Sequence, residues 1–148
     1  MSLTLRDARS TDAGRVGAIL SAFIDETEWM PRLHSRAEDI SFAGSMIERG
    51  WVRVAETAVG LAGFIARDAT EVNALYVAPE GQRQGTGTAL LQDAMDASET
   101  LELWTFVLNT PARRFYAKHG FAELSRGDGS TNEEGLPDIR LRWQRSVS

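Results

Sequence analysis

The stretch EVNALYVAPEGQRQGTGTALL, residues 71–91, combines three local patterns in an unbroken order. Residues 71–79 are rich in apolar and β-branched side chains and end near a proline, which is typical of a strand. Three glycines then lie within residues 81–87. From about residue 86 to residue 98, apolar side chains recur at helical spacing. The stretch therefore predicts a strand, a glycine-rich turn and a helix.

A glycine-rich turn that leads into a helix is suited to hold an anion. The first backbone N–H groups of a helix have no partner inside it and carry the positive end of the helix dipole, so a phosphate or pyrophosphate fits there. Gly85 and Gly87 have no Cβ atom, so phosphate oxygens can approach the backbone closely. Arg83 adds a positive charge. The alternative at this point is a tight turn that binds nothing.

Two common phosphate motifs do not fit this turn. A Walker loop requires a lysine directly after its last glycine, and no lysine follows these glycines. A dinucleotide fingerprint is expected between the first strand and the first helix of a parallel unit. This turn instead follows the fourth predicted strand, within a run of consecutive strands.

The patterns on either side predict a single α/β domain over residues 1–148. Predicted strands cover residues 3–8, 51–57, 60–68, 71–79, 101–108, 121–126 and 138–143, and predicted helices begin near residues 11, 36, 86 and 110. The order β-α-α-β-β-β-α-β-α-β-β predicts a mixed sheet with an antiparallel first half and helices on both faces. The apolar run LELWTFVL, residues 101–108, predicts a central strand that is covered on both faces.

Composition excludes several classes of protein. The 148 residues are 43% hydrophobic and 25% charged, which is typical of a soluble globular domain. No apolar run approaches a membrane span, and the N-terminus lacks the apolar segment of a signal peptide, so we expect a cytoplasmic location. The net charge of −5 argues against nucleic acid as a partner. Without cysteine, and with two distant histidines, no metal site is expected.

Two motifs carry a resemblance to a known family. The centre of the turn is the run Gln82-Arg83-Gln84-Gly85-Thr86-Gly87. It resembles the Gln/Arg-x-x-Gly-x-Gly/Ala motif of the GNAT superfamily of N-acetyltransferases. NTPARRFYAKHGF, residues 109–121, is similar to the next motif of that family, and the order of elements matches over nearly all of the chain. The resemblance implies transfer of an acetyl group from acetyl-CoA to a primary amine, by direct attack in a ternary complex.

The resemblance also implies how acetyl-CoA is held. Pantetheine would pair with the fourth strand along the backbone of Leu75, Tyr76 and Val77, and the N–H of Leu75 would stabilise the oxyanion. Asn109 would bind the pantetheine arm, or else it caps the helix that follows. The pyrophosphate would lie on the backbone of the turn and the helix start: Gln82, Arg83, Gln84, Gly85, Thr86, Gly87 and Thr88.

Two side chains are candidates for proton transfer by the same resemblance. Tyr116 is the candidate acid, because a phenol with a reference pKa of about 10 is protonated at neutral pH and can supply a proton to the departing thiolate. Its alternative role is to pack beside Phe115. Glu71 is the candidate base for the amine. Its alternative role is that of a solvated carboxylate at a strand end, with water as the base.

The acceptor side of this family lies between the connection of the first two helices and the loop between the last two strands. Here those segments carry Trp29, His34 and Glu133 as candidate substrate-binding residues. Trp29 could stack on a substrate or pack in the core. Further polar residues of the long loop are Asp128, Asn132, Glu134 and Asp138. Acidic residues beside an aromatic ring suggest a cationic acceptor, such as a small amine or a peptide amine.

Two other functions stay open on the sequence. A non-catalytic module that senses acetyl-CoA, or acts as a scaffold, would keep the glycine turn and lose the acid, but Tyr116 is present. An unrelated nucleotide-binding domain would prefer ATP or NAD to acetyl-CoA. A homodimer is an alternative to a monomer, because symmetric dimers are common among soluble proteins.

Overall fold

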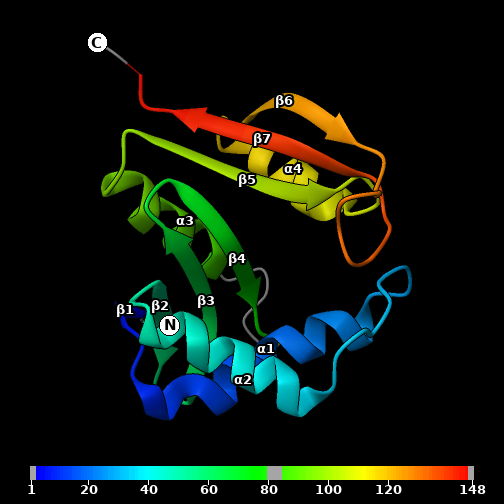
Figure 1. Ribbon diagram of the computed structural model, residues 1–148. Helices are drawn as coiled ribbons and strands as arrows, with labels where there is room; N and C mark the ends of the chain where they lie inside the picture. Colours follow the sequence, from blue (N-terminus) through cyan, green and yellow to red (C-terminus); the bar gives the residue numbers. More distant parts are fainter. Residues whose placement is uncertain (1–2, 80–84, 147–148) are drawn as a thin grey trace.

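The computed structural model describes residues 3–79 and 85–146 (Figure 1). The strands are β1 (Thr4–Asp7), β2 (Val52–Thr57), β3 (Gly60–Asp68), β4 (Glu71–Val77), β5 (Thr100–Phe106), β6 (Ala122–Gly127) and β7 (Asp138–Gln144). The helices are α1 (Ala13–Glu26), α2 (Arg36–Glu48), α3 (Thr86–Asp96) and α4 (Thr110–Lys118), and a short 3-10 turn, η1 (Ser10–Asp12), precedes α1. The predicted order of elements is confirmed.

The strands form one seven-stranded sheet in the order β1-β2-β3-β4-β5-β7-β6. β1 to β4 are antiparallel neighbours, as expected for consecutive strands. β4 and β5 are parallel, and β7 lies between β5 and β6 with antiparallel pairing on both sides. The mixed sheet with an antiparallel first half is therefore confirmed.

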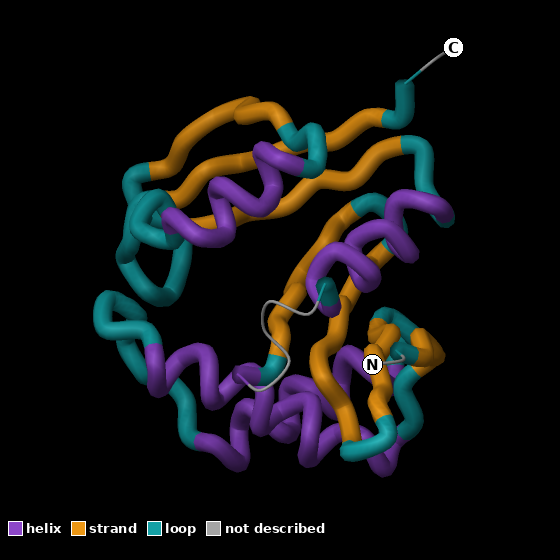
Figure 2. The backbone as a smooth tube through the Cα atoms, turned by 180° about the vertical axis from the view of Figure 1, so that it is seen from behind, coloured by secondary structure: helices purple, strands orange, loops and turns teal. Residues whose placement is uncertain are grey.

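Helices cover both faces of the sheet because side chains alternate along its strands. On β3, Phe64 and Ala66 pack in one core cluster with residues of α1 and α2, such as Val16 and Met46. Ile65 points to the other face and joins a second cluster with residues of α3 and α4. Figure 2, the view from behind, shows α3 and α4 lying on that second face. Two local features of helix starts are present, the Ser35–Glu38 capping box of α2 and a proline in the first turn of α4.

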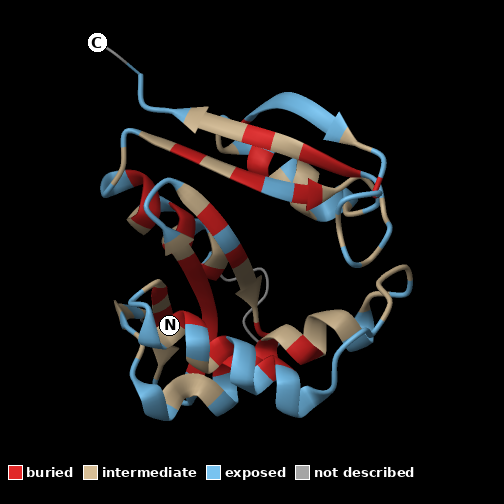
Figure 3. Cartoon of the chain, viewed as in Figure 1, coloured by how far each residue is buried: buried red, intermediate tan, exposed pale blue. Residues whose placement is uncertain are grey.

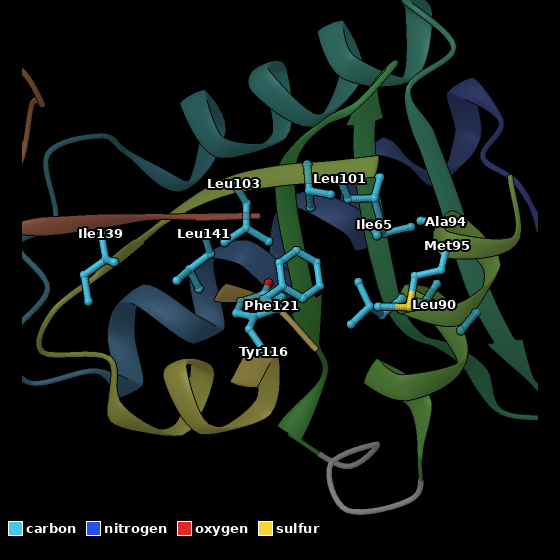
Figure 4. Packing of buried hydrophobic residues seen from close by; sticks show 13 residues of the cluster. Ile65, Leu90, Ala94, Met95, Leu101, Leu103, Tyr116, Phe121, Ile139 and Leu141 are labelled. Carbon is cyan, nitrogen blue, oxygen red and sulfur yellow. The ribbon is translucent and has the colours of Figure 1, made fainter. Parts of the chain in front are cut away.

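The second cluster carries Tyr116 into the core (Figure 4). Leu90 and Leu91 of α3 are fully buried there, together with Leu101 of β5. The Tyr116 ring packs edge-on against Phe121, with centroids 5.2 Å apart. The position of α4, and so of Tyr116, is therefore set by the same core that holds α3.

The prediction that residues 101–108 are covered on both faces is wrong. Leu101 and Leu103 are buried, but Trp104 between Leu103 and Thr105 is 51% exposed, and Figure 3 shows the exposed positions along this half of the sheet. The reason is that the cluster with α1 and α2 contains residues of β2, β3 and β4 but none of β5. The guanidinium of Arg140 lies 5.5 Å from the Trp104 ring and covers part of it instead.

The sheet opens between β4 and β5. Their only registered pair among the described residues is Glu71 with Glu102, at the start of β4. β3 and β4, in contrast, are paired from Gly63 with Val77 to Asp68 with Glu71, with one irregularity after Ala66. Beyond Glu71, the two parallel strands diverge, which Figure 1 shows as the separation of the lower and upper halves of the molecule. Backbone groups near the end of β4 are therefore not used for pairing with β5.

Within residues 3–79 and 85–146, no helix is both long and apolar enough to cross a membrane.

Candidate acetyl-CoA site

Helix α3 begins at the mouth of this opening. Gly85 is its N-cap residue and adopts a left-handed conformation, with φ of 77°. Glycine adopts this conformation without the steric cost of a Cβ atom. Among the residues that the structure describes, no side chain caps the helix, and a backbone hydrogen bond runs from the N–H of Ala89 to the carbonyl of Gly85. The helix start is therefore shaped to receive an external acceptor such as a phosphate oxygen.

Gly87 lies on the side of α3 that faces the opening. A Cβ atom at this position would lie 3.5 Å from the Phe115 ring and 3.6 Å from the Val77 side chain. Thr86 is 1% exposed and belongs to the buried side of the helix. Thr88 lies within hydrogen-bond distance of His119, 3.2 Å from Oγ1 to Nε2. The predicted contacts of Gln82, Arg83 and Gln84 lie outside the described residues.

A cleft of about 900 Å³ connects the helix start with the diverging strands. We call it the cofactor cleft. Its lining comes from the end of α1, from β4, from the start of α3 and from α4: Phe23, Glu26, Thr27, Glu28, Trp29, Leu75, Tyr76, Val77, Pro79, Gly85, Thr86, Gly87, Thr88, Asn109, Pro111, Ala112, Phe115 and Tyr116. It brings together all the described residues for which cofactor binding was predicted. Its size is in the range of small-molecule and cofactor sites.

The cleft has groups suited to the pyrophosphate and to the pantetheine arm of acetyl-CoA. The start of α3 would receive the pyrophosphate, and the unpaired edge of β4 at Leu75 and Val77 would pair with the amides of pantetheine. Asn109 is the N-cap of α4, because its Oδ1 accepts a hydrogen bond from the N–H of Ala112 at 3.2 Å. Its side chain also lines the cleft. The capping role leaves the Nδ2 group for a ligand, so the two predicted roles of Asn109 are compatible.

Tyr116 combines packing with access to the cleft. It is 8% exposed and packs between Phe115 and Phe121, yet it lines the cofactor cleft. No described residue forms a hydrogen bond with its hydroxyl group. Burial raises the pKa of Tyr116, and the nearby phenol of Tyr76 adds to the effect. The hydroxyl group is therefore protonated at neutral pH, as an acid must be.

A raised pKa also limits what this phenol can do. A thiol, with a reference pKa of about 8.5, is a stronger acid than a phenol at about 10. Complete transfer of a proton from Tyr116 to a free thiolate is therefore uphill, and burial makes it more so. The phenol can donate a hydrogen bond to the sulfur while the C–S bond breaks. Its proton can then move to the sulfur when the attacking nitrogen gives up one of its own protons.

Glu71 does not line the cofactor cleft. Its two carboxylate oxygens accept hydrogen bonds from Nη1 and Nη2 of Arg140, at 2.7 and 2.6 Å. Arg140 also lies 3.1 Å from Glu102, the partner of Glu71 across the β4–β5 pair. This ion-pair network joins the two halves of the sheet at the point where they begin to diverge. This contact is a structural role for Glu71, and its role as the base stays a prediction.

A second cavity of about 570 Å³ adjoins the cofactor cleft. We call it the side groove, lined by apolar residues of α1 and α2 such as Leu20 and Phe42, and by Glu133 and Glu134 of the β6–β7 loop. Phe23 and Tyr76 line both cavities. The side groove therefore meets the cofactor cleft at Phe23 and Tyr76.

The predicted acceptor residues are placed in different ways. Trp29 lines the cofactor cleft and packs edge-on against Phe23 and Phe106, with centroids 6.5 and 5.8 Å apart. It thus packs and faces the cleft at once. His34 lines the side groove, and its Nε2 atom lies 2.8 Å from Glu133. Glu133 raises the pKa of His34, mainly through this hydrogen bond.

The His34–Glu133 contact joins the α1–α2 connection to the β6–β7 loop, which face each other in Figure 1. Other polar residues of that loop hold its own shape. Asn132 bonds through both ends of its amide to the backbone of Leu136. Asp138 accepts a hydrogen bond from Asn132, and Asp128 accepts one from the N–H of Ser130. Of the predicted polar set, only Glu133 and Glu134 line the side groove.

Sequence reasoning missed Phe23. It lines the cofactor cleft and the side groove and contacts Tyr76 with ring centroids 4.8 Å apart. Along α1 it follows Val16, Ile19 and Leu20 at the same helical spacing. No feature of the sequence separates it from a residue of the core.

Among the described residues, no group of three or more acidic or histidine side chains is arranged to hold a metal ion.

Comparisons with known proteins agree with this geometry. A family model, described as an acetyltransferase (GNAT) domain, matches residues 47–123, which is more than half of the chain. A search of curated proteins found no significant match. Many solved structures have the same fold.

Three of these structures illustrate the likeness. The apo-form of YjaB from Escherichia coli has a TM-score of 0.80 and 22% identity, covering 96% of this chain and 97% of that one. YncA from Salmonella typhimurium, a putative acetyltransferase solved with acetyl-CoA, has a TM-score of 0.75 and 18% identity, with coverage of 100% and 96%. A ribosomal-protein-alanine N-acetyltransferase from Brucella melitensis has a TM-score of 0.77 and 17% identity, with coverage of 96% and 99%.

The chain belongs to the GNAT family of acetyltransferases. It is an N-acetyltransferase, and acetyl-CoA is its cosubstrate.

Proposed function

We propose that the protein transfers the acetyl group of acetyl-CoA to a primary amine by direct attack within a ternary complex. The observation that carries the proposal is the shared cleft. The start of α3, the unpaired end of β4 and Tyr116 all line one cavity, and the side groove meets it at Phe23 and Tyr76. Donor and acceptor can therefore be bound at the same time.

In the proposed reaction, the neutral amine nitrogen attacks the thioester carbon. A C–N bond forms, and the electron pair of the C=O bond moves onto the oxygen. The N–H of Leu75 would stabilise this oxyanion, a contribution worth roughly 3 kcal/mol of barrier for one preorganised donor. The C=O bond then re-forms as the C–S bond breaks, and the thiolate of CoA leaves with a hydrogen bond from Tyr116. The nitrogen loses one of its two protons and the sulfur gains one by way of Tyr116, so the products are an amide that keeps one N–H and the free thiol of CoA.

The amine must lose a proton before it attacks. By the lysine reference pKa of about 10.4, an ordinary alkyl amine is roughly 0.04% neutral at pH 7. Because Glu71 is held by Arg140 outside the cleft, we propose water as the first acceptor of this proton. The rate should then rise with pH up to the pKa of the bound amine.

An acceptor screen that monitors CoA release tests this function. Initial rates measured at several concentrations of both substrates should give intersecting lines, as a ternary complex requires. Acetyl-CoA should raise the Tm, whereas ATP and NAD should not. Binding of acetyl-CoA without turnover on any amine would instead favour a sensor or scaffold module. The single domain over residues 1–148, a cytoplasmic location and a homodimer stay predictions from the sequence.

A further inference from the structure

The side groove presents an apolar wall. Its lining includes Leu20, Phe23, Ile24 and Phe42 from α1 and α2. Phe42 is 54% exposed, and Leu33, which also lines the groove, is 48% exposed. Contact of such large apolar side chains with water is unfavourable, and a bound apolar group would remove that contact. The wall is therefore suited to an apolar body and offers little to a polyhydroxylated or polycationic one.

Four carboxylates line the same groove, and three of them have partners in the protein. Asp39 is buried and accepts hydrogen bonds from Ser21 and Arg32. Glu38 accepts a hydrogen bond from the backbone N–H of Ser35 at 2.9 Å. Glu133 is engaged by His34, as described above. Each of these three carboxylates is thus engaged by another group of the protein.

Glu134 differs from the other three. It is half-buried, and among the described residues its carboxylate has no hydrogen bond and no ion pair. A half-buried carboxylate without a partner favours a cation beside it. Glu134 and Tyr76 line the same groove, and Tyr76 also lines the cofactor cleft. Burial, with a smaller effect of the Glu134 charge, raises the pKa of Tyr76 to about 12.

We propose that Glu134 binds the ammonium group of the acceptor, and that the apolar wall of the side groove holds the rest of it, so that the acceptor is a monoamine with an aryl or alkyl body. This inference rests on the proposed function for the place of the thioester. Tyr76 follows Leu75 on β4, so an ammonium group held beside Tyr76 lies near the proposed oxyanion donor. Glu134 acts here as a specificity-determining residue.

The test measures binding directly, so that it can fail independently of turnover. Calorimetry would titrate the CoA-bound protein with 2-phenylethylamine and, separately, with spermidine. The wild-type protein should bind 2-phenylethylamine at least tenfold more tightly than spermidine. Glu134→Gln keeps the side-chain shape and removes the charge, so affinity for 2-phenylethylamine should fall by about 10- to 100-fold, because hydrogen bonds to charged groups contribute on this scale.

Glu48→Gln is the control, because Glu48 is exposed at the end of α2 and lines neither the side groove nor the cofactor cleft. It should change the affinity for 2-phenylethylamine by no more than about twofold, because a solvent-exposed charge outside the groove is screened. Unchanged CoA binding in both variants would show that they are folded. Wild-type affinity in Glu134→Gln, tighter binding of spermidine, or no binding of 2-phenylethylamine would each overturn the inference. Failure of every amine to release CoA would count against the proposed function instead.

Discussion

Both carboxylate oxygens of Glu71 accept hydrogen bonds from the guanidinium group of Arg140, at 2.6 and 2.7 Å. The two residues lie 69 positions apart in the sequence and on either side of the place where β4 and β5 diverge. Arg140 is the more buried partner, with its side chain 18% exposed. The pair therefore holds the two halves of the sheet together at the end of the cofactor cleft.

Glu71→Gln should lower stability and leave the pH dependence of the reaction unchanged. Loss of a charged, bidentate contact should lower the free energy of unfolding by roughly 1–2 kcal/mol. Thermal unfolding would measure the first effect, and profiles of kcat/KM from pH 6 to 9 the second. Glu102→Gln, on the other carboxylate near Arg140, serves as the control. If the kcat/KM of Glu71→Gln is far below the wild-type value at pH 6 and equal to it at pH 9, Glu71 acts as the base.

Tyr116→Phe should reduce kcat by about 100-fold, the usual scale of a general acid–base group. The ring and its contacts with Phe115 and Phe121 would remain, so stability and acetyl-CoA affinity should change little. Steady-state kinetics and calorimetry would measure these quantities. Tyr76→Phe is the control for the other phenol at the cleft. Full turnover by Tyr116→Phe would remove the residue from the mechanism.

The two glycines of the α3 start should respond differently to substitution. Gly87→Val places methyl groups toward Phe115 and Val77 in the cleft, so affinity for CoA should fall at least tenfold, or about 1.4 kcal/mol. Gly85→Val should also weaken CoA binding and cost roughly 1–2 kcal/mol of stability, because a side chain opposes φ of 77°. Gly14→Ala, on α1 where a Cβ meets no atom within 4 Å, is the control. Unchanged CoA affinity in the folded Gly87→Val protein would exclude binding at this helix start.

Asn109 allows its two roles to be separated. Asn109→Asp retains an N-cap oxygen and removes the amide donor, whereas Asn109→Ala removes both. Stability should fall by about 1 kcal/mol in the alanine variant alone, while KM for acetyl-CoA should rise in both. Thermal unfolding and kinetics at saturating amine would test this. If KM is unchanged in both variants, Asn109 acts only as the cap of α4.

The two histidines should titrate on opposite sides of the ordinary histidine pKa, near 6.5. Glu133 raises the pKa of His34, whereas burial, with a smaller effect of Lys118, lowers the pKa of His119. NMR titration of the imidazole signals would show the order. Glu133→Gln should bring the His34 pKa back toward 6.5 and leave His119 unchanged. Equal values for the two residues in the wild-type protein would contradict the His34–Glu133 contact.

The same contact has a consequence for stability. A histidine whose pKa is higher in the folded than in the unfolded state stabilises the fold fully below the unfolded pKa, and this stabilisation is lost as the pH rises through the folded pKa. The difference in Tm between wild type and His34→Gln should therefore be largest from pH 5 to 6 and shrink above the raised pKa. Thermal scans from pH 5 to 8.5 would measure it. A difference that grows with pH would contradict the sign.

Local signals in the sequence determined the elements and the start of the cofactor site. The Ser35–Glu38 capping box, Pro111 after Asn109 and the glycines before α3 each act within a few residues, so they predict helix starts without knowledge of the rest of the chain. Apolar periodicity predicted the strands in the same way. The family resemblance then predicted the members of the cleft, and the described ones lie together.

Only the tertiary structure decided which side chains meet. The family resemblance predicted Glu71 as the base, and the apolar run predicted Trp104 as a covered residue. The contacts of Glu71 depend on Arg140 in β7, and the exposure of Trp104 depends on how far α1 and α2 extend over the sheet. The sequence does not distinguish Glu134 from the neighbouring Glu133. Only the structure shows that Glu133 contacts His34, 99 positions away, and that Glu134 has no such contact among the described residues. The physical reason is that desolvation and charge pairing depend on contacts between distant segments, whereas caps and periodicity depend on adjacent residues.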